Sequence, residues 1–267
     1  MSSSNLNQAI LEVIVYFDLF SYPLTSLEIW QNLEHKATYL EVYEQLLKSQ
    51  WLRTRMSTDC GMWFLRGRES IVITRQSNYR ASKEKIDKVR RFVRIARFIP
   101  WIQNIFACNS LGFLHSRPES DIDLFIVVRR GRIWCARFFA VLVAKLFGRP
   151  HATHFKDAVC LSFFAVEGAN MEKVALAQDD VYFRHWLAHL LPLYARGGKK
   201  RTHLSIGSFF ERVLRAFQLR IMPARLRAMA NKGTGVVITD EFLKFHDHDR
   251  REYFQKEYER RVAAMAA

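Results

Sequence analysis

The sequence is poor in the residues that build several familiar kinds of site. It has four cysteines among 267 residues, and no two of them form a Cys-x-x-Cys pair. This spacing argues against a zinc ribbon and against a dithiol redox motif. The 11 glycines form neither a phosphate-binding P-loop nor a Rossmann fingerprint, and there is no His-Glu-x-x-His zinc-protease motif. The cysteine usage fits a reducing cytoplasm best.

Long apolar runs are also missing. The longest apolar stretch, residues 138–143 with its flanks, is interrupted by Arg137 and Lys145 and is too short to cross a bilayer. Residues 1–8 are polar and lack the basic-then-apolar order of a signal peptide. We therefore expect a cytoplasmic protein with no membrane partner.

Acidic residues are outnumbered, with 26 Asp and Glu against 41 Lys and Arg, which gives a formal net charge of +15. This excess favours an anionic partner such as a nucleotide, a nucleic acid or an acidic surface, although a basic composition can also serve solubility alone. Hydrophobic residues make up 49% of the chain, enough for a sizeable core in one large domain or two smaller ones.

The first 68 residues have the outline of a winged helix. Apolar residues at helical spacing predict a helix over 6–20. Two capping boxes, in which Thr precedes Glu by three residues, predict helices over 26–33 and 38–49. Two extended segments, 51–55 and 62–66, would follow as a hairpin. The third helix has one cation, Lys48, beside Glu41 and Glu44, which favours protein docking over sequence-specific reading of DNA.

The middle of the chain reads as an α/β domain. Residues 69–98 form a basic stretch with an apolar face, which is typical of a solvated linker helix or of a nucleic-acid contact. Strand-like runs over 102–108, 121–128 and 159–166 follow, and an apolar helix is expected over 133–147. This strand–helix–strand order indicates an α/β-type core with a small mixed sheet.

Beyond residue 179 the sequence again favours helices. We expect one over 208–230, bent at Pro223, a brief extended segment over 236–238 and a charged helix over 240–264. The predicted fold class is α+β, with a winged-helix-like domain over 1–75, a core domain over 76–178 and a helical C-terminal region over 179–267. His246-Asp247-His248-Asp249 would lie on the last helix, where a solvated face is favoured over a phosphohydrolase metal site.

Two carboxylates open the strand over 121–128. Asp121 and Asp123 are two positions apart, so both side chains should lie on one face while Ile122 points to the core. Such a pair repels itself unless a cation lies between the two carboxylates, and hard oxygen ligands suit Mg²⁺ or Mn²⁺. Strand-entry acids in solvent are the simpler alternative for Asp121 and Asp123.

Ser110, a possible phosphate contact, is separated from Asp121 by ten residues. Asn109 and Ser110 follow the strand over 102–108 and open a short helix expected over 111–115. Ser110 can offer its backbone N–H and its hydroxyl to a phosphate, or it can simply cap the helix. Asn109 suits a tight turn with a positive φ angle.

These segments resemble the DNA polymerase beta nucleotidyltransferase superfamily, whose signature is Gly-Ser, about ten residues, and Asp-x-Asp in an apolar strand. The resemblance is closest to bacterial and archaeal proteins that join a winged-helix-like region to such a domain. It is carried by residues 16–25, 117–127 and 160–164. It implies that Asp121 and Asp123 hold Mg²⁺ or Mn²⁺, that Ser110 contacts a nucleoside triphosphate beside Asn109, and that the α-phosphate is attacked with loss of pyrophosphate.

The sequence departs from that signature in two places. Asn109 replaces the glycine, and the strand over 159–166 carries no internal acid where the family has a third carboxylate. Asp157 before this strand is the best candidate for the third acid, and Glu167 after it is the second. Charge alone nominates Arg117 and Lys232 as triphosphate contacts.

Two functions are compatible with these residues. The first is a metal-dependent nucleotidyltransferase that moves a nucleoside monophosphate from a nucleoside triphosphate to an acceptor, which could be a nucleic acid or a protein. Its catalytic residues would be Asp121, Asp123 and Asp157. The second is a catalytically degenerate module that binds nucleotide or nucleic acid and docks a partner through its winged helix.

Overall fold

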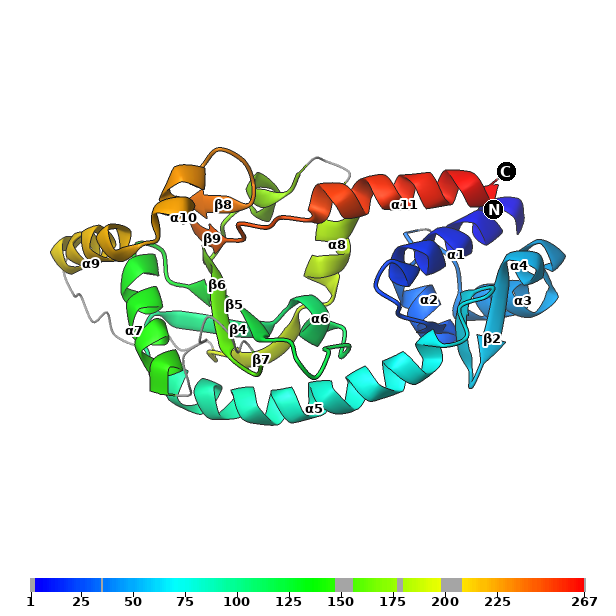
Figure 1. Cartoon of the computed structure of the whole chain (residues 1–267), viewed down its shortest axis with the longest axis horizontal. Coiled ribbons are helices and arrows are strands. Elements are labelled where there is room, and N and C mark those ends of the chain that lie inside the picture. Colours follow the sequence, from blue (N-terminus) through cyan, green and yellow to red (C-terminus); the bar gives the residue numbers. More distant parts are fainter. Residues whose placement is uncertain (1–2, 35, 147–155, 177–179, 198–207, 267) are drawn as a thin grey trace. The chain divides into compact units, whose positions relative to one another are not determined.

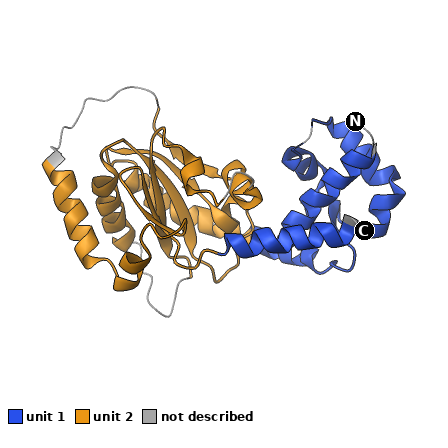
Figure 2. Cartoon of the chain, turned by 90° about the horizontal axis from the view of Figure 1, so that it is seen from above, with its two compact units in different colours: residues 1–79, 250–267 blue, residues 80–249 orange. Residues whose placement is uncertain are grey.

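The computed structural model describes residues 3–34, 36–146, 156–176, 180–197 and 208–266 (Figure 1). It divides the chain into two compact units, residues 1–79 with 250–267 and residues 80–249 (Figure 2). Helix α5 (Ile71–Ala96) begins in the first unit and ends in the second. The boundary expected at residue 178 falls inside the second unit.

The helices expected at the start of the chain are confirmed. They are α1 (Ser3–Asp18), α2 (Ser26–Asn32) and α3 (Tyr39–Lys48). Both capping boxes are formed. At α2 the Thr25 hydroxyl accepts from the Glu28 N–H at 3.2 Å, while the Glu28 carboxylate accepts from the Thr25 N–H at 2.8 Å. These bonds satisfy backbone donors that have no partner inside the helix.

The hairpin of the first unit begins later than the sequence indicated. Residues 51–55 were expected to be extended, but they belong to helix α4 (Gln50–Arg55). Ser49 caps this helix by accepting from the Leu52 N–H at 3.3 Å, which gives a short polar segment its helical start. Strands β2 (Met56–Asp59) and β3 (Met62–Leu65) then form the expected hairpin, and β1 (Leu24–Thr25) pairs with β3.

The last helix, α11 (Arg251–Ala266), completes the first unit by packing against α1. Asp18 at the end of α1 is buried and forms two ion pairs. Its carboxylate contacts the Arg261 guanidinium at 2.6 Å and the Arg68 guanidinium at 2.9 Å. Segments from the two ends of the chain therefore share one core.

The second unit is built on a six-stranded mixed sheet of order β7-β4-β5-β6-β9-β8. The strands expected first are confirmed as β4 (Ile102–Ala107), β5 (Ile122–Val128) and β6 (Val159–Val166). β5 and β6 are parallel, whereas β4 is antiparallel to β5. The remaining strands are β7 (Leu191–Ala195), β8 (Val236–Ile238) and β9 (Phe242–Phe245).

Two of these strands were not predicted. β7 is a five-residue edge strand interrupted by Pro192, and edge strands tolerate proline because one side of the strand needs no hydrogen bonds. The helix expected over 240–264 is wrong for its first part, because residues 242–245 form β9 and α11 begins at Arg251. The expected bend at Pro223 is a break between α9 (Ser208–Ile221) and α10 (Ala224–Met229).

The sheet has a different helical layer on each face. One face packs against the C-terminal half of α5, against α7 (Ile133–Leu146) and against Leu214 of α9. The other face packs against α8 (Val181–Ala188) and the 3-10 helix Met171–Val174. Strand β5 alternates between them, with Ile122, Leu124 and Ile126 in the first core and Phe125 in the second. Among the described residues, no helix is long and apolar enough to cross a membrane.

Candidate metal and nucleotide site

Asp121 and Asp123 lie at the start of β5, on the α8 side of the sheet. Strand β6 runs parallel to β5 and places Cys160 directly opposite Asp123. One possible ligand atom from each of Asp121, Asp123 and Cys160 lies within 4.8 Å of the others. The expected convergence of the two carboxylates on one face is present, and a thiol lies beside them.

The electrostatics of this cluster are unfavourable without a counter-charge. Burial and then the neighbouring Asp121 carboxylate raise the pKa of Asp123 to about 6. Burial also raises the pKa of Asp121, although Lys85 acts in the opposite direction. The pKa of the Cys160 thiol is raised by burial and by both carboxylates. Adding a cation would reverse each of these effects, because it favours the ionised forms.

Asn109 holds one of the carboxylates in place. It follows β4 with a φ angle of 52°, as expected for a tight turn, and its amide N–H donates to Asp123 Oδ2 at 2.9 Å. The Trp186 indole N–H of α8 donates to the Asn109 amide oxygen at 3.0 Å. Since the indole can only donate, it fixes the orientation of the amide and turns the amide nitrogen toward Asp123. Glycine would supply the turn but not this bond.

Ser110, the expected phosphate contact, opens the short helix α6 (Asn109–Gly112) and is exposed. Its hydroxyl lies 3.1 Å from the Ser116 hydroxyl. The Ser116 N–H in turn donates to the Ser82 hydroxyl at 2.8 Å, which connects this loop to α5. Ser110 is therefore held beside Asn109 in the turn that precedes the carboxylates.

Asp157, the first candidate for a third acid, is not part of the cluster formed by the described residues. Its φ angle is 60°, and its carboxylate forms ion pairs with Lys85 at 2.8 Å and Lys88 at 2.6 Å. The Lys85 side chain is 2% exposed and also donates to the Ser120 carbonyl at 2.6 Å. Partial burial would raise the pKa of Asp157, but the two lysines outweigh it and lower the pKa. A carboxylate held this way is a poor proton acceptor.

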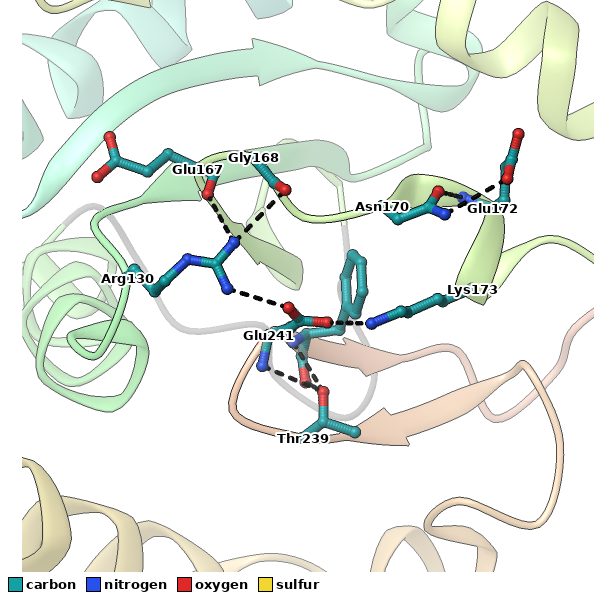
Figure 3. Close-up of polar contacts among 9 residues, drawn as sticks. Arg130, Glu167, Gly168, Asn170, Glu172, Lys173, Thr239 and Glu241 are labelled. Carbon is teal, nitrogen blue, oxygen red and sulfur yellow. Dashed lines mark hydrogen bonds and ion pairs between the residues drawn. The ribbon is translucent and has the colours of Figure 1, made fainter.

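Glu167, the second candidate, lies at the opposite end of β6 from the cluster. Val166 beside it pairs with Val128 at the end of β5, whereas Cys160 pairs with Asp123 near the start. Cys160 and Val166 are six steps apart along the strand, and at about 3.3 Å per step this separates them by roughly 20 Å. Figure 3 shows this region, where Glu241 binds Arg130 at 3.1 Å and Lys173 at 2.7 Å. In this view the Glu167 carboxylate points away from Arg130, which contacts only the backbone oxygen of Glu167.

The two cations nominated by charge are both exposed. Arg117 precedes the carboxylates in the loop between α6 and β5, and Lys232 lies in the turn between α10 and β8. The expectation that either contacts a triphosphate stays a prediction.

A further polar group extends the cluster toward β9. The Ser162 hydroxyl lies 2.9 Å from the Nε2 atom of His246, which directly follows β9 and is not on the helix expected there. Cys160 hydrogen-bonds Ser162. The sequence did not single out Trp186, His246 or Cys160 for this site. Strict alternation along β6 would not have indicated Cys160, because the register against β5 shifts between Cys160 and Phe163 and leaves both residues on the α8 side.

The donor set fits a divalent cation. Two carboxylates and a thiol on adjacent strands provide negative charge when ionised. Asn109 orients the Asp123 carboxylate by donating a hydrogen bond to it. Oxygen donors suit Mg²⁺ and Mn²⁺, while a thiolate favours softer ions such as Zn²⁺. In comparisons with known proteins, no family model matches the sequence, and no match was found among curated proteins or among solved structures.

Proposed function

We propose that the second unit is a metal-dependent nucleotidyltransferase that moves a nucleoside monophosphate from a nucleoside triphosphate to an acceptor. The observation that carries this proposal is the placement of Asp121 and Asp123 on one face at the start of β5, with their ligand atoms within reach of a single ion. A bound divalent ion would neutralise the triphosphate and stabilise charge on the reacting phosphoryl group.

In the proposed reaction a hydroxyl oxygen of the acceptor attacks the α-phosphorus. The bond between the acceptor oxygen and the α-phosphorus forms, the bond from the α-phosphorus to the bridging oxygen breaks, and pyrophosphate leaves. Asn109 keeps the Asp123 carboxylate turned toward the metal position, and Ser110 lies in the adjacent turn to contact phosphate oxygens. Solvent would accept the acceptor's proton, since Asp157 is neutralised by two lysines.

The second candidate is a module that binds metal and nucleotide without transferring a group. It is favoured by strand β6, where Cys160 lies opposite Asp123 and no acid lies between residues 159 and 166. Loss of a third carboxylate weakens metal placement and removes a base. In this case the first unit would dock the partner.

The two candidates are separated by one assay. The purified protein is incubated with each α-³²P-labelled nucleoside triphosphate, Mg²⁺ or Mn²⁺, and an acceptor that is RNA, a protein extract or the protein itself. Label transfer that is lost in Asp121→Asn and kept in Glu119→Gln supports the enzyme, because Glu119 is an exposed acid in the preceding loop.

Equilibrium dialysis with the same labelled nucleotides covers the other outcomes. Metal-dependent nucleotide binding without transfer to any acceptor supports the module. Absence of metal-dependent binding overturns both candidates, because each requires the Asp121 and Asp123 pair to hold a cation next to a triphosphate.

A further inference from the structure

Helix α9 carries an exposed apolar face beside the face that makes its core contacts, and Phe217 at this exposed face lies against Phe138 of α7. Leu214 and Gln218 of α9 are buried, as is Met222 just after the helix. Five other apolar side chains are 45–67% exposed, and they recur at helical spacing along a single stripe: Phe209, Phe210, Val213, Phe217 and Ile221. We call these five residues the α9 stripe. A stripe of this size on a helix usually marks a contact surface.

Next to the stripe lies an open groove of about 580 Å³ between α9, α10 and β8. Three arginines line it, Arg215 and Arg220 from α9 and Arg227 from α10, together with Asn231. Arg215 pairs with Asp240 at 2.9 Å. No carboxylate of the described residues forms an ion pair with Arg220 or Arg227. The groove therefore has an excess of positive charge and guanidinium donors suited to a phosphate.

Among the described residues, Asp240 is the one acid that forms an ion pair with a groove arginine, and it leaves Arg220 and Arg227 unpaired with any carboxylate. Glu211 is the one acid on α9, and it points toward the core. Its carboxylate accepts from the Trp134 N–H at 2.7 Å and from the Cys135 N–H at 3.0 Å, at the start of α7. The outer surface of α9 and α10 thus combines aromatic and aliphatic side chains with exposed arginines.

We propose that α9 and α10 form a docking surface for an anionic lipid bilayer. The α9 stripe enters the interfacial region of the membrane, and the arginine groove binds the phosphate of an anionic headgroup. A helix lying in the interface with apolar residues on one side and cations beside them is the arrangement that such surfaces require. The expectation of no membrane partner rested on the lack of a spanning segment, and a surface that binds at the interface does not need one.

The charge distribution selects this occupant over two others. A second copy of the chain would bring the same arginines together, and like charges repel. A nucleic acid would pair with the arginines but would leave Val213 and Ile221 without an apolar partner. A bilayer satisfies both features. The surface contains none of Asp121, Asp123 and Cys160, so the proposal is independent of the proposed function.

The test is co-sedimentation of the whole protein with vesicles of phosphatidylcholine, either pure or with about a third phosphatidylglycerol. We expect binding to the mixed vesicles that weakens with salt, and little binding to the pure ones. Arg220→Gln with Arg227→Gln should weaken binding about thirtyfold, since each cation contributes roughly fivefold at an anionic surface. Phe209→Ser with Ile221→Ser should weaken it on the order of a hundredfold, because two apolar anchors are lost.

Matched controls lie on α5 and in the turn that follows it. Ile73 and Phe98 are each 73% exposed, so Ile73→Ser with Phe98→Ser removes comparable apolar surface elsewhere, and Arg91→Gln with Arg94→Gln removes equal charge. Circular dichroism confirms that each variant is folded. Both control variants should sediment like the parent protein.

Four results would overturn the proposal. The first is absence of binding to the mixed vesicles, and the second is an equal loss of binding in the control variants. The third is that the protein does not bind vesicles but binds inorganic phosphate or a 20-nucleotide RNA, and that this binding requires Arg220 and Arg227. The fourth is self-association, measured by analytical ultracentrifugation, that Phe209→Ser with Ile221→Ser abolishes while vesicle binding is unchanged.

Discussion

At the scale of single residues, the cluster of Asp121, Asp123 and Cys160 depends on a side chain that stands where the nucleotidyltransferase signature has a glycine. Asn109 adopts the positive φ angle that the turn needs and also donates to Asp123. Its amide is oriented by Trp186, which packs against Phe125 and Phe163 from the two central strands. The position of the Asp123 carboxylate is thus determined by the apolar packing of α8 on the sheet.

Asp123→Asn should stabilise the metal-free protein at pH 8. The ionised carboxylate is partly buried beside Asp121, and an amide can accept the same bond from Asn109. The gain should be about 2 kcal/mol, less than the roughly 3 kcal/mol that corresponds to raising the pKa from 3.8 to about 6. Thermal unfolding in EDTA measures this gain, and the stabilisation by added Mn²⁺ should be lost. A less stable variant would show that the ionised Asp123 carboxylate does not destabilise the metal-free protein.

The pH dependence of that gain has a definite sign. The folded-state pKa of Asp123 is about 6, above its ordinary value of 3.8, so the folded state holds this proton more tightly than the unfolded state. The contribution of Asp123 to stability is therefore present below about pH 4 and is lost as the pH rises through about 6. The advantage of Asp123→Asn should be full at pH 8 and absent at pH 4.

Cys160→Asp should shift the metal preference of the cluster. Replacing the thiol opposite Asp123 by a carboxylate supplies the third oxygen ligand that Mg²⁺ prefers. We expect about tenfold tighter Mg²⁺ binding and weaker Zn²⁺ binding, both measured by isothermal titration calorimetry. Cys135→Ser, which changes a buried cysteine on α7, is the control and should leave both affinities unchanged. Unchanged metal affinities in Cys160→Asp would place the thiol outside the coordination sphere.

At the scale of elements, the sequence predicted the segments that carry a clear local signal, such as alternating apolar residues or a capping box. Strand β5 was predictable because apolar residues alternate with the two acids, and α2 and α3 because each begins with a capping box. Strands β7 and β9 have four or five residues and gain their order from pairing with β4 and β6. No local pattern distinguishes such segments from a helix or a loop.

The candidate site was predictable to the same extent. Two acids separated by one residue on a strand must share a face, so local geometry brings Asp121 and Asp123 together. The neighbours of this pair depend on register and on side chains from distant segments. Asp157 lies two residues before β6, yet its carboxylate binds Lys85, which is 72 residues earlier in the chain. Cys160 takes the place beside the pair because β6 pairs with β5 in one particular register.

Asp157→Asn should weaken the attachment of α5 to the sheet. The Lys85 side chain is 2% exposed, and the substitution removes its charged partner while its bonds to the Ser120 and Pro118 carbonyls stay. We expect a loss of about 2 kcal/mol at pH 7, measured by urea unfolding. Asp87→Asn is the control, because Asp87 is 71% exposed in its pair with Arg90 and should contribute less than about 0.5 kcal/mol. Equal effects in the two variants would contradict a structural role for the Asp157 pair.

At the scale of the whole molecule, the chain begins and ends in the same compact unit. Residues 1–79 and 250–267 share one core, and residues 80–249 form the unit that contains the cluster of Asp121, Asp123 and Cys160. A ligand stabilises the structure that binds it, so each unit should respond to its own perturbation. Hydrogen–deuterium exchange reports this response element by element.

Mn²⁺ should slow amide exchange in β4, β5 and β6 without changing it in α1 or α11, because Asp121 and Asp123 belong to the second unit.

Arg261→Gln should have the complementary effect. It removes one of two cations from Asp18, which is 4% exposed, and should speed exchange at the end of α1 and in α11 by about tenfold. Arg260→Gln is the control, since Arg260 is 67% exposed and pairs with Glu257 on the same helix. Faster exchange in β5 of Arg261→Gln, or protection of α1 by Mn²⁺, would show instead that the two units unfold as one.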